Sequence, residues 1–391
     1  MKTASHHEPR SPIVGVLGGG QLAQMLSQAA TPLGITISIL APDLASVLPG
    51  LREGVVIGDW NDPETVVRFC QHVDVLTLEN EFVPPACLNA VEASGVACFP
   101  TPASLRLIQD KWTQKRALLA AGVSVVACDE VKTPVDVAEF AHRHGWPVVL
   151  KRRHLGYDGK GNATLRSADE IPMAWKRLAG PDHGLYVEAF CPFDRELAVM
   201  VCRDVSGQTV TYPVVDTVQR DHICHIVRAP SQLAPDQVAL ARERAVAAVI
   251  AIGGVGCFGV EMFLTAEGEI LVNELAPRVH NSGHYSIEAC ACSQFENHLR
   301  AVLGWPLGDA RLRAPAAVMV NLLGQADGPG HPAGLAEALS VAGAHIHLYG
   351  KARSMPGRKM GHVTALGSTV EEAEAIAAAA ARSLYFGRRP A

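Results

Sequence analysis

The stretch CFGVEMFLTAEGEILVNELAPRVHNSGH, residues 257–284, decides the fold because it reads as two apolar strands joined by a turn. Glu267-Gly268 lies between the strands and suits the centre of a hairpin. Counting outward from a two-residue turn at this pair places Glu261 directly opposite Glu274. The sequence therefore predicts two carboxylates that face each other on one side of a β-hairpin.

Paired carboxylates in an apolar setting need a compensating charge. Like charges directly opposite each other on a sheet cost about 0.2–1 kcal/mol, and burial increases that cost. A hard divalent cation removes the repulsion because carboxylate oxygens are its preferred ligands, and Mg²⁺ completes its shell with water and phosphate oxygens. The hairpin thus predicts Mg²⁺, or Mn²⁺ in its place, carrying a nucleotide. The alternative is that one glutamate lies beyond the paired strands and is solvated.

The segment that follows the second strand is rich in hydrogen-bond donors. It contains Arg278, His280, Asn281 and Ser282 next to a glycine. Donors of this kind beside a metal suit an anionic substrate. We therefore expect this segment to form part of a substrate site, although a polar surface loop has a similar composition.

Length and composition exclude several classes of protein. The 391 residues are enough for two or three domains, and 48% hydrophobic with 19% charged residues indicates a globular chain. The net charge of −5 gives no reason to expect nucleic acid or an anionic membrane as a partner. Ten cysteines without a C-x-x-C pair are expected to be reduced thiols of a cytoplasmic protein. Residues 1–10 are polar and are expected to form a flexible tail, neither signal peptide nor anchor.

Residues 13–100 alternate apolar strands with helices, which is typical of a doubly wound parallel sheet. The pattern Gly-x-Gly-x-x-Ala at 18–23 matches the dinucleotide fingerprint, and Asp43 lies near the position of a ribose-binding acid. Glycine turns at strand ends bind any phosphate, so the pattern alone is a weak argument for a dehydrogenase. Glu79 follows a later strand, where it would either contact a ligand or cap a helix.

Two basic segments in the middle of the chain suit phosphate. Residues 104–122 read as a single helix with Lys111 and Lys115 on one face, and a solvated face is the alternative for these lysines. The strand that ends in Lys151 leads into a loop with three glycines at 156–161. Backbone N–H groups of such a loop can approach phosphates, although a plain basic hairpin turn would look similar.

The rest of the chain reads as an antiparallel sheet followed by a smaller unit. The expected strands lie at 123–128, 185–190, 196–201, 209–216 and 223–227, and the expected helices at 134–144, 235–252 and 293–303. Beyond the break at 304–306 we expect strands near 316–323, 344–349 and 361–366 and a helix at 369–385. Lys351 and Arg358 form a basic cluster that suits an anion or a solvated loop.

Three blocks in this order resemble the ATP-grasp fold: a glycine-rich loop after a strand ending in lysine, a glutamate on a later strand, and a hairpin with paired glutamates. The strings KRRHLGYDGKG at 151–161, NELAPRVHNSGH at 273–284 and PGRKMGH at 356–362 resemble those of the 5-(carboxyamino)imidazole ribonucleotide synthase family. GGGQLAQM at 18–25 is similar to the N-terminal motif of that family, with Ala23 where glycine is usual. The resemblance covers nearly the whole chain after residue 11.

The resemblance implies an ATP-grasp fold with a Rossmann-like N-terminal domain at 11–107, a central domain at 108–305 and a small C-terminal domain at 306–391. It implies a ligase that carboxylates the amine of 5-aminoimidazole ribonucleotide with ATP and bicarbonate, through carboxyphosphate, in purine biosynthesis. It further implies a cytoplasmic homodimer whose other partners are small molecules, with no nucleic acid and no membrane among them.

The resemblance also implies roles for individual residues. Those expected to contact ATP are Lys111, Lys151, Gly156, Tyr157, Asp158, Gly159, Lys160, Gly161, Asn162, Glu188, Ala189, Phe190, Cys191, Glu196, Gln219, Asn273 and Glu274. Gln219 stands where the family often has histidine. The two-residue register points Asn273 to the face opposite Glu274. Glu261 and Glu274 would hold Mg²⁺.

Further residues are implied for the ribonucleotide and for catalysis. Asp158, beside Tyr157, is the candidate for handling the amine proton, and Arg278 would meet bicarbonate or carboxyphosphate. The residues expected to bind the ribonucleotide are Gln21, Glu79, His280, Asn281, Ser282, Lys351 and Arg358.

Three alternatives compete with this interpretation. Another ATP-grasp ligase, such as a formate-dependent glycinamide ribonucleotide transformylase or a biotin carboxylase, would share the ATP residues but not the cluster at 356–362. An NAD-dependent dehydrogenase would leave the paired glutamates unexplained. A non-catalytic nucleotide sensor would bind ATP without substrate-dependent hydrolysis.

Overall fold

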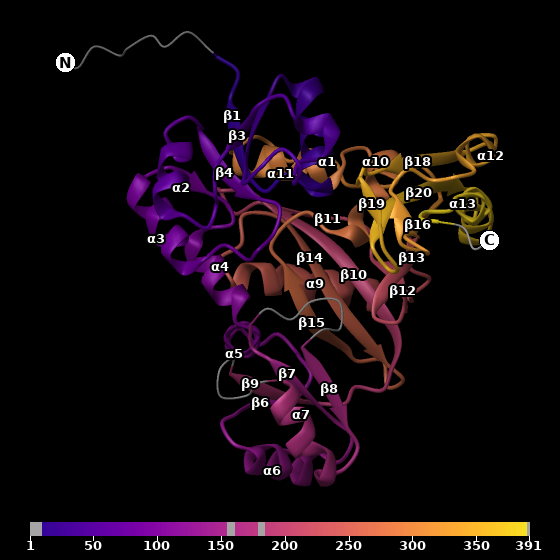
Figure 1. Cartoon of the computed structure of the whole chain (residues 1–391). Coiled ribbons are helices and arrows are strands. Elements are labelled where there is room, and N and C mark those ends of the chain that lie inside the picture. Colours follow the sequence, from indigo (N-terminus) through magenta and orange to yellow (C-terminus); the bar gives the residue numbers. More distant parts are fainter. Residues whose placement is uncertain (1–9, 155–160, 179–183, 389–391) are drawn as a thin grey trace. The chain divides into compact units, whose positions relative to one another are not determined.

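The computed structural model describes residues 10–154, 161–178 and 184–388. The chain divides into two compact units, one that ends at Pro102 and one that begins at Ala103 (Figure 1). The domain limits expected after residues 107 and 305 remain predictions.

The first unit is built on a parallel sheet, as its alternating apolar runs predict. The strands lie in the order β3-β2-β1-β4-β5 and every neighbouring pair is parallel. They are β1 Ile13–Leu17, β2 Thr36–Ala41, β3 Val55–Ile57, β4 Val75–Leu78 and β5 Ala97–Cys98, with helices α1 Gln21–Ala30, α2 Pro63–Cys70 and α3 Pro85–Ser94. β4 is buried along its whole length, which explains why it is apolar at nearly every position.

The second unit contains a small antiparallel sheet in the order β6-β9-β7-β8. Its elements are β6 Cys128–Val131, α6 Pro134–His144, β7 Val148–Arg152, β8 Asn162–Leu165, α7 Ile171–Arg177 and β9 Leu185–Ala189. The two helices pack with the sheet around one apolar core that includes Phe140 and Leu150. The strand expected at 123–128 is wrong, because β6 begins only at Cys128. Val125, within the expected range, makes a single bridge to Val272 instead.

A nine-stranded sheet dominates the second unit (Figure 1). Its main path is β15-β14-β10-β12-β13-β16-β20-β18, and β11 pairs with β10 beside that path. The strands are β10 Phe193–Arg203, β11 Thr209–Thr211, β12 Val215–Arg220, β13 Ile223–Ala229, β14 Gly256–Thr265, β15 Ile270–Ala276, β16 Ala316–Leu323, β18 Ala344–Leu348 and β20 Lys359–Gly367. The C-terminal strands therefore continue the central sheet through the pairing of β13 with β16.

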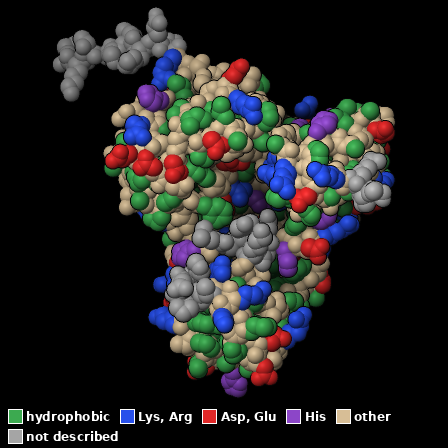
Figure 2. All heavy atoms as spheres, viewed as in Figure 1, with side chains coloured by type: hydrophobic (Ala, Val, Ile, Leu, Met, Phe, Trp, Pro, Cys, Tyr) green, Lys and Arg blue, Asp and Glu red, His purple; other side chains and the backbone are tan. Residues whose placement is uncertain are grey.

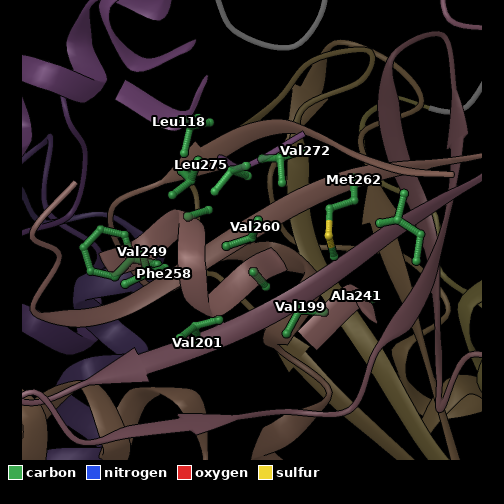
Figure 3. Close-up of a cluster of buried hydrophobic side chains, with 14 of the residues drawn as sticks. Leu118, Val199, Val201, Ala241, Val249, Phe258, Val260, Met262, Val272 and Leu275 are labelled. Atoms are coloured by element: carbon green, nitrogen blue, oxygen red, sulfur yellow. The ribbon is translucent and has the colours of Figure 1, made fainter. Parts of the chain in front are cut away.

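Helices and short strands complete this unit. They are α9 Pro235–Ala251, α10 Ser286–Ala289, α11 Gln294–Val302, α12 Leu335–Leu339, α13 Val370–Ser383, β17 Gly328–Pro329 and β19 Arg353–Ser354. α9 packs against β14, β15 and β10 and closes the main core. Figure 3 shows side chains of that core, among them Val249 of α9 with Phe258 and Val260 of β14.

Two expected elements are each divided in the structure. The helix expected at 104–122 is α4 Pro102–Gln109 followed by α5 Lys111–Ala120. The Asp110 side chain accepts hydrogen bonds from the N–H groups of Trp112 and Thr113, so it caps a new helix where we expected a continuous one. The strand expected at 209–216 is likewise divided into β11 and β12, which both pair with β10.

Charge is distributed evenly over the face of the molecule in Figure 2, where Lys and Arg side chains are interspersed with Asp and Glu. This mixture agrees with the small net charge of −5. In the described ranges, no helix is both long and apolar enough to cross a bilayer.

Candidate active site

The opposed glutamates of the hairpin are present, but the register around them differs from the expected one. Glu261 of β14 pairs with Glu274 of β15, which confirms the predicted pair. The turn is longer than two residues, because Leu264 pairs with Ile270 and the ladder shifts next to Glu261. An extra residue in β15, Asn273, forms a β-bulge and restores the pairing of the two carboxylates.

The bulge also corrects the expected direction of Asn273. Val272 and Leu275 belong to the buried core, whereas Asn273 and Glu274, which lie between them, are both partly exposed. Two consecutive residues therefore lie on the side of the strand away from the core. The expectation that Asn273 points to the face opposite Glu274 is wrong.

The surroundings of the hairpin disfavour ionisation of both opposed carboxylates at once. Burial first, and the neighbouring carboxylates of Glu274 and Glu196 second, raise the pKa of Glu261 to about 8. Lys111 Nζ lies 3.2 Å from Glu274 Oε2, and His280 Nε2 lies 3.7 Å from Glu261 Oε1. The described part of the chain has no group of three or more His, Cys, Asp or Glu able to hold a metal. Two opposed carboxylates with a lysine beside them fit Mg²⁺, which needs few protein ligands.

Lys151 is held beside the hairpin by a buried ion-pair network. Its Nζ lies 2.5 Å from Glu188 Oε2, and Lys115 Nζ lies 3.0 Å from Glu188 Oε1. Glu188 and Lys115 are only 3% and 2% exposed, so each depends on the other for charge compensation. Although burial alone would raise the pKa of Glu188, the two lysines lower it to about 2.

Lys115 is one residue of this site that sequence reasoning missed. Its Nζ also donates to the carbonyl of Val272 at 3.4 Å, directly before the bulge. Lys115 thus joins Lys151, through Glu188, to the strand that contains Glu274. The sequence does place Lys115 one helical turn after Lys111. We interpreted that spacing only as two lysines on one face of a helix.

The predicted glycine loop is described only in part. Gly156, Tyr157, Asp158, Gly159 and Lys160 lie outside the described residues. Gly161 has φ of +93°, and its carbonyl accepts from Arg152 N at 2.8 Å. Asn162 begins β8 and pairs with Lys151 on β7, which places the described end of the loop at the predicted phosphate lysine.

Residues 188–191, expected to contact ATP, span the end of β9 and the two positions after it. Ala189 ends that strand, and Phe190 N donates to Pro147 O at 3.3 Å while its side chain remains 47% exposed. Cys191, half-buried, comes next. Glu188, the first residue of the expected segment, has its carboxylate engaged by two lysines.

Glu196 and Gln219, both expected to contact ATP, come together on neighbouring strands. Glu196 of β10 is opposite Thr217 of β12 and Phe263 of β14, so it lies on the same face as Glu261. Burial raises the pKa of Glu196, and a hydrogen bond with Gln219 partly offsets that rise. Gln219, which stands where the family often has histidine, is therefore a hydrogen-bond partner of Glu196. Its contact with the nucleotide remains a prediction.

The donor segment after β15 is ordered by internal contacts. His280 Nδ1 lies 2.8 Å from Ser282 Oγ, and the Asn281 amide is engaged by Asn321. Arg278 donates to Val279 O at 3.4 Å. The roles of these residues toward bicarbonate and the imidazole remain predictions.

The basic residues of the C-terminal strands also have carbonyl partners. Lys351 Nζ donates to Lys359 O at 2.7 Å, and Arg358 donates to Arg353 O at 2.7 Å. Lys359 lowers the pKa of Glu261 by its charge, so the segment 356–362 lies near the opposed glutamates. We had not singled out Lys359 as a site residue.

The glycine turn of the first unit is filled by the protein's own carboxylate. Gly20 N donates to Glu79 Oε2 at 2.6 Å, and a Cβ on Gly20 would lie 2.0 Å from Glu79 Oε1. Helix α1 begins at Gln21, so Glu79 occupies the position in which a dinucleotide phosphate would bind. Asp43, the expected ribose acid, accepts instead from Ser46 N at 2.7 Å within its own turn. Both observations argue against a dehydrogenase. The roles of Gln21 and Glu79 toward the ribonucleotide remain predictions.

Three family models match consecutive parts of the chain. The ribonucleotide synthetase preATP-grasp domain matches residues 12–109, and the ATP-grasp domain matches residues 116–295. The phosphoribosylaminoimidazole carboxylase C-terminal domain matches residues 317–376. These matches confirm the expected ATP-grasp fold with a Rossmann-like N-terminal domain and a small C-terminal domain.

Two curated relatives are similar over most of this chain. The N5-carboxyaminoimidazole ribonucleotide synthase of Synechococcus elongatus is 40% identical over 360 residues, which cover 90% of this chain and 88% of that protein. The phosphoribosylaminoimidazole carboxylase of Schizosaccharomyces pombe is 43% identical over 370 residues, which cover 93% of this chain and 66% of the longer protein. The chain thus spans about two thirds of the length of that carboxylase.

A solved structure is similar over nearly the whole fold. It is the N5-carboxyaminoimidazole synthase of Aspergillus clavatus in complex with ADP and 5-aminoimidazole ribonucleotide. The identity is 39% and the TM-score 0.84, over 94% of this chain and 96% of that one. By motif, by sequence and by structure, the chain belongs to the N5-carboxyaminoimidazole ribonucleotide synthase family of ATP-grasp enzymes.

Proposed function

We propose that this chain carboxylates the exocyclic amine of 5-aminoimidazole ribonucleotide, using ATP and bicarbonate and releasing ADP and phosphate. The observation that carries the proposal is the opposed pair Glu261 and Glu274 with Lys111 3.2 Å from the latter. Membership of the synthase family supports the choice of substrates, since a member has been solved with ADP and this ribonucleotide.

The chemistry requires bicarbonate to be activated before the amine attacks. Transfer of the γ-phosphoryl group of ATP to a bicarbonate oxygen forms carboxyphosphate and releases ADP. The amine nitrogen then forms a bond to the carboxyl carbon, the bond from that carbon to the phosphate oxygen breaks, and one proton leaves the nitrogen. Cations fixed in place before the transfer stabilise the charge that develops on the phosphoryl group. Lys111 and Lys151 are held for that purpose by Glu274 and Glu188.

Glu261 and Glu274 would hold Mg²⁺, or Mn²⁺ in its place. Their opposition on one strand pair and the raised pKa of Glu261 support this assignment, because an added cation would relieve both. Asn273 lies beside them on the same side of the bulge and would bind the nucleotide. When bound, the ion neutralises phosphate charge during transfer.

The remaining substrate groups are assigned to the donor segment and the C-terminal cluster. Arg278 binds bicarbonate or carboxyphosphate, and His280 and Ser282 border the imidazole. Lys351 and Arg358 bind the phosphate of the ribonucleotide. Asp158 and Tyr157, outside the described residues, are proposed to handle the amine proton.

Release of ADP tests this function directly. We expect ADP release, followed with a coupled pyruvate kinase assay, to require both the ribonucleotide and bicarbonate. Carbon-13 bicarbonate should give a carbamate carbon bound to the amine nitrogen in NMR spectra. ADP release that instead requires formate and glycinamide ribonucleotide would overturn the assignment, as would turnover without any amine substrate.

We also propose an oligomeric state and a cellular compartment for this chain. The homodimer rests on the resemblance to the family, and the cytoplasm on the free thiols of all ten cysteines. Light scattering after gel filtration should give twice the chain mass of 41.5 kDa. A single-chain mass at micromolar concentration would exclude the stable dimer.

A further inference from the structure

A row of polar side chains crosses three neighbouring strands of the large sheet. Asn321 on β16 pairs with His362 on β20, and His362 pairs with His347 on β18. Residues directly opposite each other on antiparallel strands point to the same face. We call this set the polar row (Asn321, His362 and His347).

The other face of the same strands is apolar. Leu322, Val363 and Ile346 each neighbour a member of the polar row and belong to the core that includes α13. Because side chains alternate along a strand, the polar row faces away from that core. Asn321 and His362 are nevertheless only 5% and 0% exposed, so another part of the chain must cover them.

The covering part begins in the donor segment and continues into α10. Asn281 and Asn321 exchange two hydrogen bonds, of 2.9 and 2.7 Å. The ring of His284 packs against that of His362, with ring centroids 5.1 Å apart. Glu288 Oε1 lies 2.6 Å from Nε2 of His347.

The spacing of these partners explains how one segment reaches all three strands. Positions 281, 284 and 288 follow the i, i+3, i+7 pattern that places side chains on one side of a helical segment. The segment is helical in two short pieces, a 3-10 turn at Asn281–Gly283 and α10 at Ser286–Ala289. Each partner therefore meets one strand of the polar row.

The polar row also reaches the C-terminal basic cluster. The Tyr349 hydroxyl lies 3.0 Å from Nδ1 of His362. Lys351 Nζ lies 5.6 Å from the centre of the Tyr349 ring, within the range of a cation–π contact. His362 thus contacts both the segment that carries the predicted imidazole contacts and the tyrosine beside the predicted phosphate lysine.

The central histidines pack as neutral rings. Burial lowers the pKa of both His284 and His362 well below the ordinary value. The neighbouring charges of His280 and Lys359 lower the pKa of His284 further, and His284 lowers that of His362. Gln294 Nε2 lies 3.0 Å from Nδ1 of His284 and fixes that ring from the other side. Uncharged rings can pack against the segment without mutual repulsion.

We propose that Asn321, His362 and His347 are positioning residues that fix the loop 280–283 relative to Lys351. The two ends of one ribonucleotide, imidazole and phosphate, would then be bound at a set separation. The identity of the substrate in this inference rests on the proposed function. The polar row acts through Asn281, His284 and Tyr349, while ATP depends on a different set of residues.

Steady-state kinetics and calorimetry test the proposal with Asn321→Ala. We expect the KM and the Kd for the ribonucleotide to rise about tenfold or more, because loss of the reciprocal amide bonds releases the loop. The KM for ATP should change less than twofold. His347→Gln should give a smaller change in the same direction, since it removes one contact at the far end of the segment.

Ile346→Ala is the matched control. This side chain lies one residue from His347 but on the apolar face, so its loss lowers stability without touching the loop. Both KM values should stay within twofold of wild type. An equal rise of both KM values in Asn321→Ala, or the same pattern in the control, would overturn the proposal. If Asn321→Ala does not fold, Asn321→Ser provides the same test.

Hydrogen exchange without ligands separates this proposal from the proposed function. Amides at 281–289 should exchange at least about tenfold faster in Asn321→Ala than in Ile346→Ala. Unchanged exchange there would overturn the positioning role even in an active enzyme. Faster exchange in a protein that shows no ribonucleotide-dependent ADP release would support the positioning role and overturn the substrate.

Discussion

Lys111 and Lys115 are one helical turn apart, yet the structure uses them differently. Lys111 lies beside Glu274 with its side chain 18% exposed, whereas Lys115 is buried against Glu188. The helical spacing predicts that both share a face, but the partner of the second comes from β9, much later in the chain. A long-range ion pair of this kind cannot be predicted from local pattern, and Lys115 was therefore missed.

The metal role that we propose for Glu274 predicts a large loss of activity with no loss of stability. Glu274→Gln should lower kcat by at least about 100-fold, a size typical of removing one preorganised charge-stabilising group. The free energy of unfolding without Mg²⁺ should stay the same or rise, because the repulsion from Glu261 is removed. ADP release and urea denaturation measure the two effects.

Glu267→Gln, in the exposed turn of the same hairpin, provides the control and should keep wild-type turnover. Near-normal turnover of Glu274→Gln would contradict the metal assignment. Equal losses in both variants would point to a general effect of the hairpin.

Glu188 predicts a specific dependence of stability on acid. Its pKa falls from 4.5 to about 2 on folding, so its stabilisation is present above about pH 4.5 and is lost as the pH falls toward 2. The contribution at pH 7 is roughly 3 kcal/mol on this basis. The difference in unfolding free energy between wild type and Glu188→Gln should therefore shrink between pH 5 and pH 3. A difference that stays constant over that range in urea titrations would contradict the ion-pair network.

At the scale of elements, the hairpin shows what a local sequence pattern can predict and what it cannot. Alternation and the turn pair predicted that Glu261 and Glu274 oppose each other, and they do. The expected two-residue turn was wrong, and the bulge at Asn273 compensated for the longer turn. A bulge adds one residue without changing composition, so counting along the chain could not detect it.

The bulge predicts that deletion of Asn273 is tolerated by the fold. Without this residue Val272 and Glu274 would become neighbours, and a regular ladder would still pair Glu274 with Glu261. The melting temperature should stay within about 8 °C of wild type, the shift that corresponds to roughly 1–2 kcal/mol. Turnover should fall, because the amide beside the carboxylates is lost.

Deletion of Leu271, in the regular part of β15, is the comparison. It shifts the alternation so that core-facing and outward-facing residues exchange sides, and we expect that variant not to fold. Equal damage from both deletions, measured by circular dichroism, would contradict the compensating role of the bulge.

Helix boundaries show a second limit of prediction. The 104–122 region has a continuous helical pattern, but Asp110 caps a new helix and also binds the guanidinium of Arg153. The cap residue was visible in the sequence, whereas its arginine partner was not, since Arg153 directly follows β7, far from Asp110 along the chain. Most other elements were predicted to within a few residues because their apolar periodicity is strong.

At the scale of the whole molecule, the family and the fold followed from a few motifs, while the sheet topology did not. Strand strings at 316–323 and 361–366 were expected to form a unit of their own. The structure instead joins β16 to β13, with Arg228 of β13 bound to Glu374 of α13 at 2.6 and 3.0 Å. Edge-to-edge pairing between distant strands leaves no local signal in either strand.

The shared sheet predicts that a shortened chain ending at Pro306 is poorly soluble. Removal of β16 would expose the edge of β13, including Val227, which is fully buried. An unprotected apolar edge strand favours aggregation. Sedimentation should find most of the shortened protein in the pellet. Ile226→Lys in the same shortened chain should recover soluble protein, and a soluble monomer without that change would contradict the prediction.

The pairing of β13 with β16 limits where parts of two related enzymes can be joined in a chimera. A C-terminal region taken from a relative must supply a strand whose register fits β13 of the recipient. Chimeras should therefore fold when β13 and β16 come from the same parent. A crossover at the break Gly304-Trp305-Pro306, which separates these two strands, should be less successful.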